Sequence, residues 1–199
     1  MKRLANLIGG EWLPPQDGQY FDDHNPATGA KIAEIPSSTA DDIEVAVAAA
    51  RAAQPAWGAL PPGERADWLD RIADALEARS DEIAELESRD TGKPVALARA
   101  VDAARSVLNF RFFAELGREL PEEQYLMEDA VNVVVRKPVG VAGLITPWNL
   151  PLYLLSWKVA PAILMGNTVV AKPSRLTPLT ANLLVEVVTE AGLPAGGVN

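Results

Sequence analysis

The chain has 199 residues, of which 48% are hydrophobic, and a formal net charge of −9. This composition fits a soluble globular protein with an apolar core. The negative charge, without any cluster of Lys and Arg, argues against nucleic acids and anionic membranes as partners, so small molecules or other subunits are expected. The longest apolar stretch, 150–165, is too short for a membrane span, and no signal-peptide core is recognisable, so a cytoplasmic location is expected.

The counts of cysteine and histidine limit the chemistry. The chain contains 0 Cys and 1 His. It therefore offers no thiolate for nucleophilic attack and can form no disulfide. The lone His24 makes neither a catalytic triad nor a metal site, so no metal is expected.

The first part of the chain predicts short strands followed by helices. Residues 7–36 are punctuated by glycine and proline pairs that are typical of turns between strands. From Thr39 the pattern becomes helical, with Thr39 or Asp41 as the cap and Pro55 as the end of the helix. A second helix is predicted over about 63–89, and its Asp and Glu residues are expected to be mostly solvated rather than paired in a site.

A third helix is predicted after a break at residues 91–94 and extends through Leu116. Arg105 falls at the margin of its apolar stripe, where an Arg usually extends along the surface or pairs with a carboxylate. A functional Arg is the alternative. The stripe expected to pack into the core comprises Leu97, Val101, Ala104, Leu108 and Phe112.

Residues 119–138 have a different character. Val131, Val133 and Val135 alternate with other residues as they would in a β-strand. An exposed strand beside helices needs an edge to pair with.

The last part of the chain alternates strands and helices. Thr177 is expected to cap the last helix with Pro178 in its first position, and Gly192 and Pro194 are expected to end it. The alternation predicts an α/β fold that begins a doubly wound parallel sheet, although no G-x-G-x-x-G pattern is present. The predicted elements are a strand over 140–146, a helix over about 151–165, a strand over 167–171 and a helix over about 177–191.

Polar residues follow both of these strands where they end. Asn149 closes the turn Thr146-Pro147-Trp148-Asn149, and Lys172 opens the loop Lys172-Pro173-Ser174. The carboxyl ends of parallel strands share one edge of a sheet, where open α/β sheets bind ligands. An Asn there can donate its amide to an oxygen that gains negative charge. Taken separately, the first segment also fits a turn around a buried Trp, and the second a solvated loop.

Together these segments resemble the aldehyde dehydrogenase superfamily, in which a Pro-Trp-Asn turn and a Lys-Pro-Ser loop flank the nicotinamide cofactor. Residues 105–113 and 149–158 are most similar to the branch that acts on 2-aminomuconic and 2-hydroxymuconic semialdehydes. Other matching segments cover nearly the whole chain, namely Ile8-Gly9-Gly10-Glu11-Trp12, Asn25-Pro26-Ala27-Thr28-Gly29, Asp90-Thr91-Gly92-Lys93-Pro94 and residues 191–199.

The resemblance covers only the amino-terminal portion of the family's chain. It implies the first part of the cofactor-binding domain, an incomplete doubly wound sheet, with entry strands and helices over 1–118 and the start of a Rossmann-like unit over 139–199. Between them, residues 119–138 would form a projecting β-hairpin arm that joins subunits into a homo-oligomer. The family's Cys nucleophile, Glu base and catalytic domain would lie beyond residue 199.

The resemblance also implies roles for single residues. Asn149 would form part of the oxyanion hole when the Cys attacks the aldehyde. Arg105 matches an Arg that approaches the carboxylate of the substrate in the muconic semialdehyde branch. The path of the cofactor would be lined by Ile145, Thr146, Pro147 and Trp148, and its adenosine ribose would meet Lys172 and Ser174.

One residue departs from the family's pattern. Many members carry a Glu after Lys-Pro-Ser, where this chain has Arg175. A Glu accepts hydrogen bonds from the ribose hydroxyls and repels a 2′-phosphate, whereas an Arg could pair with that phosphate. The expected cofactor is therefore NAD, with NADP as a second candidate, and an Arg175 turned to solvent is the alternative.

Two functions stay open at this point. In the first, the chain is a fragment of an NAD(P)-dependent aldehyde dehydrogenase that oxidises an aldehyde to a carboxylic acid and is inactive alone. In the second, the chain is a stand-alone truncated protein that serves as a non-catalytic interaction module through its arm. A reading frame that continues into a Gly-rich turn, a Glu and a Cys would favour the first.

Overall fold

The computed structural model describes residues 2–121 and 123–199, so Met1 and Glu122 of the predicted segments 1–118 and 119–138 lie outside the described residues. The chain begins with short strands, as predicted. β1 (Lys2–Arg3), β5 (Lys31–Pro36) and β4 (Tyr20–His24) form a three-stranded sheet, and β2 (Asn6–Ile8) pairs antiparallel with β3 (Glu11–Leu13).

Helix α1 (Ala40–Ala59) begins at Thr39, where a capping box confirms the predicted cap. The predicted end at Pro55 is wrong, because the helix continues for another turn. Trp57 in that turn is buried, and its indole N–H donates to the carbonyl oxygen of Ile163 at 2.9 Å. Tertiary packing therefore holds the last turn in place although the proline removes one helical hydrogen bond.

The predicted second helix is divided into α2 (Pro62–Ala78) and α3 (Ser80–Thr91), because the chain bends at Arg79. The Arg79 guanidinium lies 2.7 Å from a carboxylate oxygen of Glu82 and 3.2 Å from one of Glu186. The pair with Glu186 joins the bend to a distant part of the chain, and no local sequence signal marks it.

The predicted third helix consists of α4 (Val95–Ala98), a π-helical turn η1 (Arg99–Ala103) and α5 (Ala104–Glu119). Its predicted apolar stripe is wrong, since Leu97, Leu108 and Phe112 are exposed and Val101 is only partly buried. Neighbouring helices approach this segment so closely that small residues fill most of the buried face. The buried apolar residues are Ala98, Ala103, Val107, Phe110 and Ala114.

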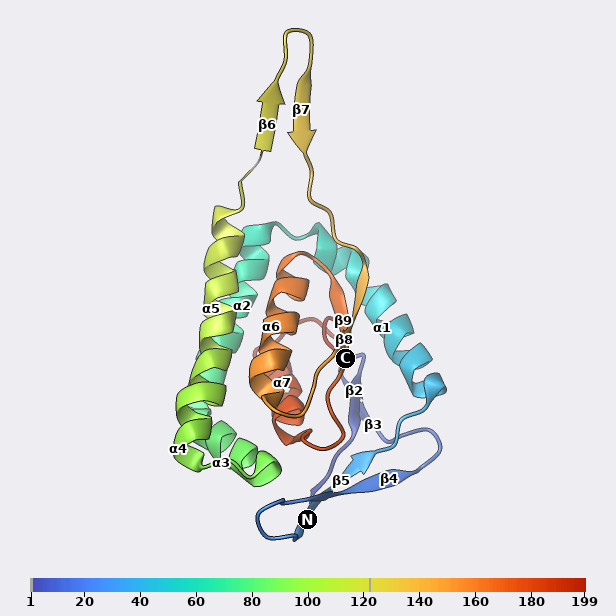
Figure 1. The fold of residues 1–199 in the computed structure, drawn as a ribbon. Helices are drawn as coiled ribbons and strands as arrows, with labels where there is room; N and C mark the ends of the chain where they lie inside the picture. Colours follow the sequence, from blue (N-terminus) through green and yellow to red (C-terminus); the bar gives the residue numbers. More distant parts are fainter. Residues whose placement is uncertain (1, 122) are drawn as a thin grey trace.

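The segment after α5 forms an antiparallel hairpin of β6 (Glu123–Leu126) and β7 (Val131–Val134). Figure 1 shows that this hairpin projects far from the rest of the molecule. The predicted strand around Val131 and Val133 is confirmed, and the side chains of β7 are exposed.

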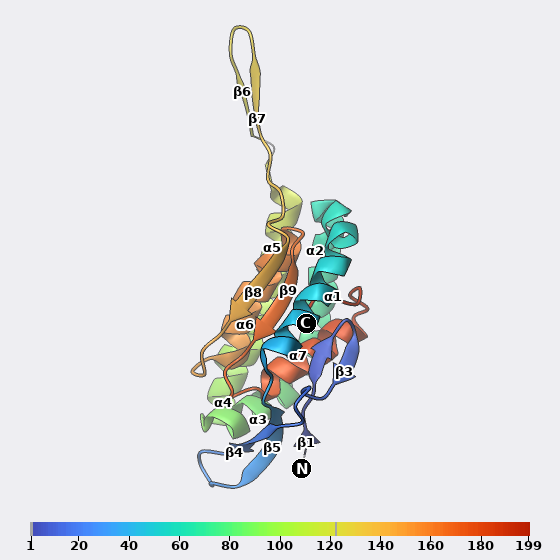
Figure 2. The same cartoon turned by 90° about the vertical axis from the view of Figure 1, so that its right-hand side faces the viewer.

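The last part of the chain has the predicted order of strand, helix, strand and helix, with β8 (Val141–Ile145), α6 (Pro151–Leu164), β9 (Thr168–Lys172) and α7 (Leu179–Glu190). β8 and β9 are parallel and lie between α1 and α6 (Figure 2). Val169 packs into the main core with α6, and Val170 packs with Ala46 and Ala50 of α1. Val198 adds a parallel bridge to the other edge of β9.

The predicted cap of the last helix is wrong by one residue. Pro178 is the residue before α7, and no side chain caps this end of the helix. The Thr177 hydroxyl instead donates to the carbonyl oxygen of Trp148 at 3.3 Å. Gly192, with a φ of 81°, follows the helix as predicted. None of the helices described is long and apolar enough to cross a membrane.

Candidate functional site

The two predicted loops meet at one edge of the parallel sheet. Ile145 and Lys172, the last residues of β8 and β9, are partners in the strand register. Beyond them, the backbone N–H of Thr146 donates to the carbonyl oxygen of Lys172 at 3.3 Å. The sequence-based expectation that both strands end at a shared edge is therefore confirmed.

The middle of the 146–150 loop, from Pro147 to Asn149, is exposed to solvent. Trp148 is 60% exposed, so the alternative of a turn around a buried Trp is wrong. Asn149 is exposed as well, and Thr146 is buried. The hydrogen bond from Thr177 to Trp148 fixes this loop to the segment that follows β9. The loop is thus held by its backbone while the Asn149 amide stays free of hydrogen bonds to the described residues.

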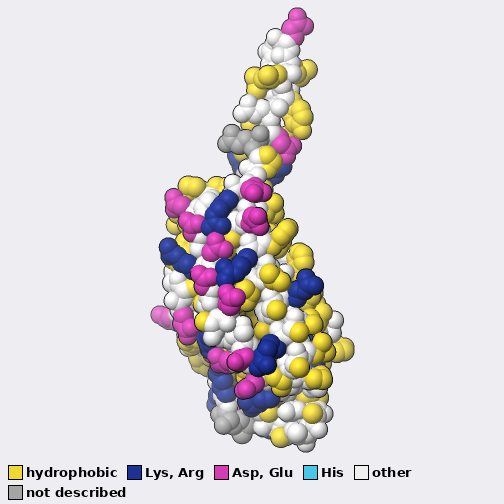
Figure 3. All heavy atoms as spheres, turned by 90° about the vertical axis from the view of Figure 1, so that its left-hand side faces the viewer, with side chains coloured by type: hydrophobic (Ala, Val, Ile, Leu, Met, Phe, Trp, Pro, Cys, Tyr) yellow, Lys and Arg dark blue, Asp and Glu magenta, His cyan; other side chains and the backbone are white. Residues whose placement is uncertain are grey.

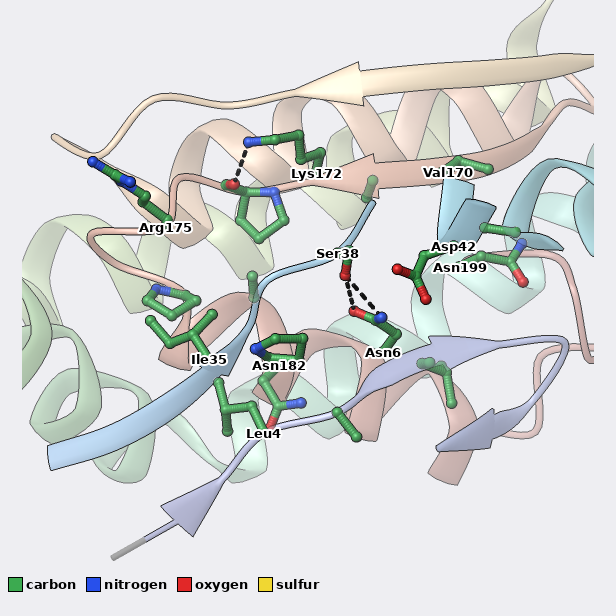
Figure 4. Close-up of a pocket in the computed structure, with 18 of the residues that line it drawn as sticks. Leu4, Asn6, Ile35, Ser38, Asp42, Val170, Lys172, Arg175, Asn182 and Asn199 are labelled. Atoms are coloured by element: carbon green, nitrogen blue, oxygen red, sulfur yellow. Dashed lines mark hydrogen bonds between the residues drawn. The ribbon is translucent and has the colours of Figure 1, made fainter. Parts of the chain in front are cut away.

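Three of the predicted cofactor residues, Lys172, Ser174 and Arg175, line a cavity of about 550 Å³. Its walls come from the amino-terminal strands, α1, β9 and α7. Figure 4 shows Lys172 and Arg175 toward one end of the cavity, and Asp42 and Asn199 toward the other. The remaining predicted residues, Ile145, Thr146, Pro147, Trp148, Asn149 and Arg105, do not line this cavity.

The charges around this cavity are uneven. Lys172 and Arg175 are its cationic residues, and Asp42 is its one carboxylate among the described residues. Asp42 accepts hydrogen bonds from the backbone N–H groups of Thr39 at 2.7 Å and Gln16 at 3.0 Å. These hydrogen bonds at the start of α1 partly neutralise the charge of Asp42. The end of the cavity that carries the two cations therefore favours an anion. This arrangement fits a phosphate-bearing ligand.

Arg175 is held at the rim of the cavity by an aromatic side chain. Its guanidinium carbon lies 5.4 Å from the ring centroid of Phe21 on β4, within the range of a cation–π contact. The contact leaves the planar edge of the guanidinium available for an anion. Arg175 is exposed, so the alternative of a side chain turned to solvent stays open.

Sequence reasoning missed a second group of residues at the α5–α6 contact. Asn109 of α5 is buried, and its Nδ2 donates to Ser156 Oγ at 2.7 Å and to the Tyr153 carbonyl oxygen at 3.3 Å. Trp157 packs edge-on against Phe113, with centroids 5.9 Å apart. A hydrogen bond between two helices depends on how the helices pack. The periodicity of either helix alone could therefore not predict it.

Lys158 was also missed. It lies on α6, and its Nζ donates to the carbonyl oxygen of Ile145 at 2.5 Å, just before the Asn149 loop. Arg105, two residues after the π-helical turn, is exposed and forms no ion pair with a described residue. The predicted alternative of pairing with a surface carboxylate is therefore not observed within residues 2–121 and 123–199.

Most acidic residues of the predicted 63–89 helix are exposed, as expected, and Glu87 is the buried exception. Glu87 and Asp90 are buried, and Asp102 of η1 is buried beside Lys93. Burial raises the pKa of Asp90 to about 8 and the pKa of Glu87 to about 7. Nowhere in the described ranges are three His, Asp or Glu side chains arranged to hold a metal ion.

Comparison with known proteins decides the family. The profile of the aldehyde dehydrogenase family matches residues 12–199. The chain belongs to this family. Among individual aldehyde dehydrogenases, it is 50% identical over 198 residues to 2-aminomuconic semialdehyde dehydrogenase from Homo sapiens, covering 98% of this chain and 40% of that protein.

A further relative and a solved structure also match the chain. The 2-hydroxymuconic semialdehyde dehydrogenase of Pseudomonas sp. strain CF600 is 46% identical over 205 residues, covering 100% of this chain and 42% of that protein. The crystal structure of PnpE in complex with nicotinamide adenine dinucleotide superimposes with a TM-score of 0.95 at 40% identity, covering 98% of this chain and 40% of that one. The chain thus spans about 40% of the length of these relatives.

Proposed function

We propose that the complete protein is an NAD(P)-dependent dehydrogenase that oxidises a carboxylate-bearing semialdehyde to the corresponding acid. The observation that carries this proposal is the shared edge of β8 and β9, where Ile145 and Lys172 are register partners and the Asn149 loop follows. The identity of 46–50% to muconic semialdehyde dehydrogenases supports the substrate class. Because the chain has 0 Cys, the nucleophile must come from residues outside these 199.

Asn149 would stabilise charge during the attack on the aldehyde. A thiolate that adds to the aldehyde carbon pushes negative charge onto the carbonyl oxygen. The exposed Asn149 amide can donate to this oxygen, while the Thr177–Trp148 hydrogen bond keeps its loop in place. The bound nicotinamide would accept the hydride that leaves the same carbon.

The remaining cofactor roles follow the two loops. Lys172 and Ser174 would contact the ribose hydroxyls of the adenosine half, since both line the cavity beside β9. The backbone and apolar side chains of Ile145, Thr146, Pro147 and Trp148 would line the path toward the nicotinamide. We also propose that the chain has three parts. Residues 1–118 form the entry strands and helices of the cofactor-binding domain, residues 119–138 form the arm, and residues 139–199 begin the Rossmann-like unit.

Arg175 would decide between the two nicotinamide cofactors. It stands at the cationic end of the cavity, over the ring of Phe21. A guanidinium at this position can form a bidentate contact to a 2′-phosphate, which NADP carries and NAD lacks. NAD stays usable because Lys172 and Ser174 are present for the ribose, and Arg175 adds affinity for NADP.

Arg105 would bind the carboxylate of the substrate. It is exposed at the start of α5, and Leu108, one turn further along the same helix, is an exposed apolar side chain. Figure 3 shows hydrophobic side chains over one half of this face and paired charges over the other half. An Arg beside apolar side chains selects an anionic group because its charge is poorly screened once a ligand covers it.

The hairpin arm would join a second copy of the chain. Its apolar side chains are exposed, with Leu126 at 81%, and Figure 3 shows them along the arm. Edge strands with exposed apolar residues pair with another chain. The same observation favours the second candidate function, a non-catalytic interaction module that acts through the arm.

The deciding experiment uses the complete protein. Purified enzyme is mixed with a carboxylate-bearing semialdehyde and either NAD or NADP, and formation of the reduced nicotinamide is recorded. Aldehyde-dependent reduction supports the dehydrogenase. Absence of reduction by a folded complete protein that still forms oligomers would favour the interaction module.

A further inference from the structure

Helices α5 and α6 lie side by side and run in the same direction (Figure 1). Two contacts define their register. Asn109 on α5 bonds to the carbonyl oxygen of Tyr153 on α6, 44 residues later in the chain. One turn further along, Phe113 packs against Trp157 with the same offset. One turn in the other direction, the same offset leads from Arg105 to Asn149, which lies in the loop two residues before the first residue of α6.

The contact at Asn109 is polar, and both partners are buried. Asn109 is 6% exposed and Ser156 is 0% exposed. Nδ2 of Asn109 donates to Ser156 Oγ at 2.7 Å, and Ser156 Oγ donates to the Tyr153 carbonyl oxygen at 2.7 Å. Buried hydrogen bonds of this kind form in one arrangement only, whereas apolar side chains tolerate small shifts between helices. The network therefore selects the register.

The neighbourhood of Arg105 needs such a constraint. Arg105 follows the π-helical turn η1 by two residues, and such turns are rare interruptions of an α-helix that occur frequently at functional sites. Ser106 Oγ donates to the Asp102 carbonyl oxygen at 2.6 Å within the same helix, but this bond does not reach α6. Asn109 is the first residue after η1 that bonds to α6.

We infer that Asn109 is a positioning residue that holds Arg105 level with the Asn149 loop. This inference rests on the proposed function, in which Arg105 binds the substrate carboxylate and Asn149 the aldehyde oxygen. A semialdehyde with a carboxylate at its other end must meet both residues at once, so their relative placement limits the rate. A neutral aldehyde needs Asn149 alone and is indifferent to this placement.

The test uses the complete enzyme with three single variants. Asn109→Leu removes the network at similar volume, Arg105→Ala removes the carboxylate contact, and Asn167→Ala is the matched control. Asn167 is also buried and bonds to two backbone groups, at Gly140 and Ala162, but at the opposite end of the sheet. Ser156→Ala removes half of the network and serves if Asn109→Leu does not fold.

The measured quantity is the ratio of kcat/KM for a carboxylate-bearing semialdehyde to kcat/KM for a neutral aldehyde of similar length. Asn109→Leu should lower this ratio by about tenfold, mainly through KM of the charged substrate, and Ser156→Ala by a smaller factor. Asn167→Ala should leave the ratio unchanged. If Arg105→Ala lowers the ratio and Asn109→Leu and Ser156→Ala do not, the positioning role is wrong.

Hydrogen exchange separates this outcome from a failure of the proposed function, because it needs no activity. Backbone amides of the first turns of α6, including Leu154, which bonds to Leu150, should exchange faster in Asn109→Leu than in Asn167→Ala. Unchanged exchange there would overturn the inference even in an inactive protein. Faster exchange in a protein without aldehyde oxidation would refute the dehydrogenase and leave the register role of Asn109 standing.

Discussion

Asp90 on α3 accepts a hydrogen bond from the backbone N–H of Leu179, the first residue of α7, at 2.8 Å. Both residues are buried, and the second carboxyl oxygen of Asp90 has no partner among the described residues. Leu179 follows the Lys172–Arg175 loop closely. This single carboxyl group therefore connects that loop to the helical scaffold.

The protonation of Asp90 should make stability depend on pH. Burial, together with the charges of Asp23 and Glu87, raises the pKa of Asp90 to about 8, and that of the unfolded chain is about 3.9. The folded state thus holds a proton that the unfolded state has released. Its stabilising contribution is complete below the unfolded value, and stability falls as the pH rises toward about 8.

Chemical denaturation of the protein between about pH 5 and pH 9 checks this expectation. The free energy of unfolding should decrease with pH, and Asp90→Asn, which mimics the protonated group, should flatten the decrease. Asp129→Asn, on the exposed hairpin tip, is the control and should keep the slope of the original protein. A slope that persists in Asp90→Asn would assign the titration to a neighbouring carboxyl group, either Asp23, whose pKa is also raised by burial, or Glu87, with a pKa of about 7.

Replacement of Asn149 by Ala in the complete enzyme should lower kcat far more than it weakens cofactor binding. An oxyanion donor acts in the transition state, and loss of one such donor lowers kcat by about 100-fold or more. Steady-state kinetics together with the dissociation constant of the cofactor give both values. Asn149→Asp, which keeps the size but loses the donor, should fall as far. A large loss of cofactor affinity with kcat retained would mean that Asn149 binds the cofactor and not the aldehyde oxygen.

Replacement of Arg175 by Glu should shift cofactor preference strongly toward NAD. A carboxylate beside Lys172 would repel a 2′-phosphate that the guanidinium attracts. The ratio of kcat/KM for NADP to that for NAD is the measurement, and the dissociation constants of ADP and adenosine 2′,5′-bisphosphate give a reading without turnover. Arg99→Glu makes the same charge change at an exposed site away from the cavity. An unchanged ratio in Arg175→Glu would mean that Arg175 points to solvent.

The isolated 199-residue chain should not oxidise any aldehyde. It contains 0 Cys, so no residue in it can form the thiohemiacetal from which the hydride leaves. The purified chain, NAD or NADP and an aldehyde should give no more reduced nicotinamide than buffer does. Reduction above that background by material of the correct intact mass would contradict the proposal that the nucleophile lies outside these 199 residues.

The sequence by itself determined the carboxyl-terminal layout of this protein. Strand patterns that lead into the Asn149 turn and to Lys172 lie on either side of a long apolar helix, and parallel strands joined by a helix must end at the same edge. The exposed Trp148 and the register of Ile145 with Lys172 agree with that expectation. Local patterns suffice here because the periodicity of hydrophobic side chains distinguishes the strands from the helix. The right-handed connection between parallel strands then leaves few possible topologies.

Only the tertiary structure decided which residues are buried where helices meet. Pro55 looked like a helix end but lies inside α1, whose last turn is held by Trp57, and on α5 Leu108 and Phe112 face outward whereas Phe110 is buried. Glu87 belongs to a helix whose acidic residues were expected to be mostly solvated, yet it accepts a hydrogen bond from Thr180 of α7, 93 residues away in the chain. The Asn109–Tyr153 bond likewise joins residues 44 positions apart. Burial and register of this kind depend on partners that are distant in sequence, and no periodicity within one helix encodes them.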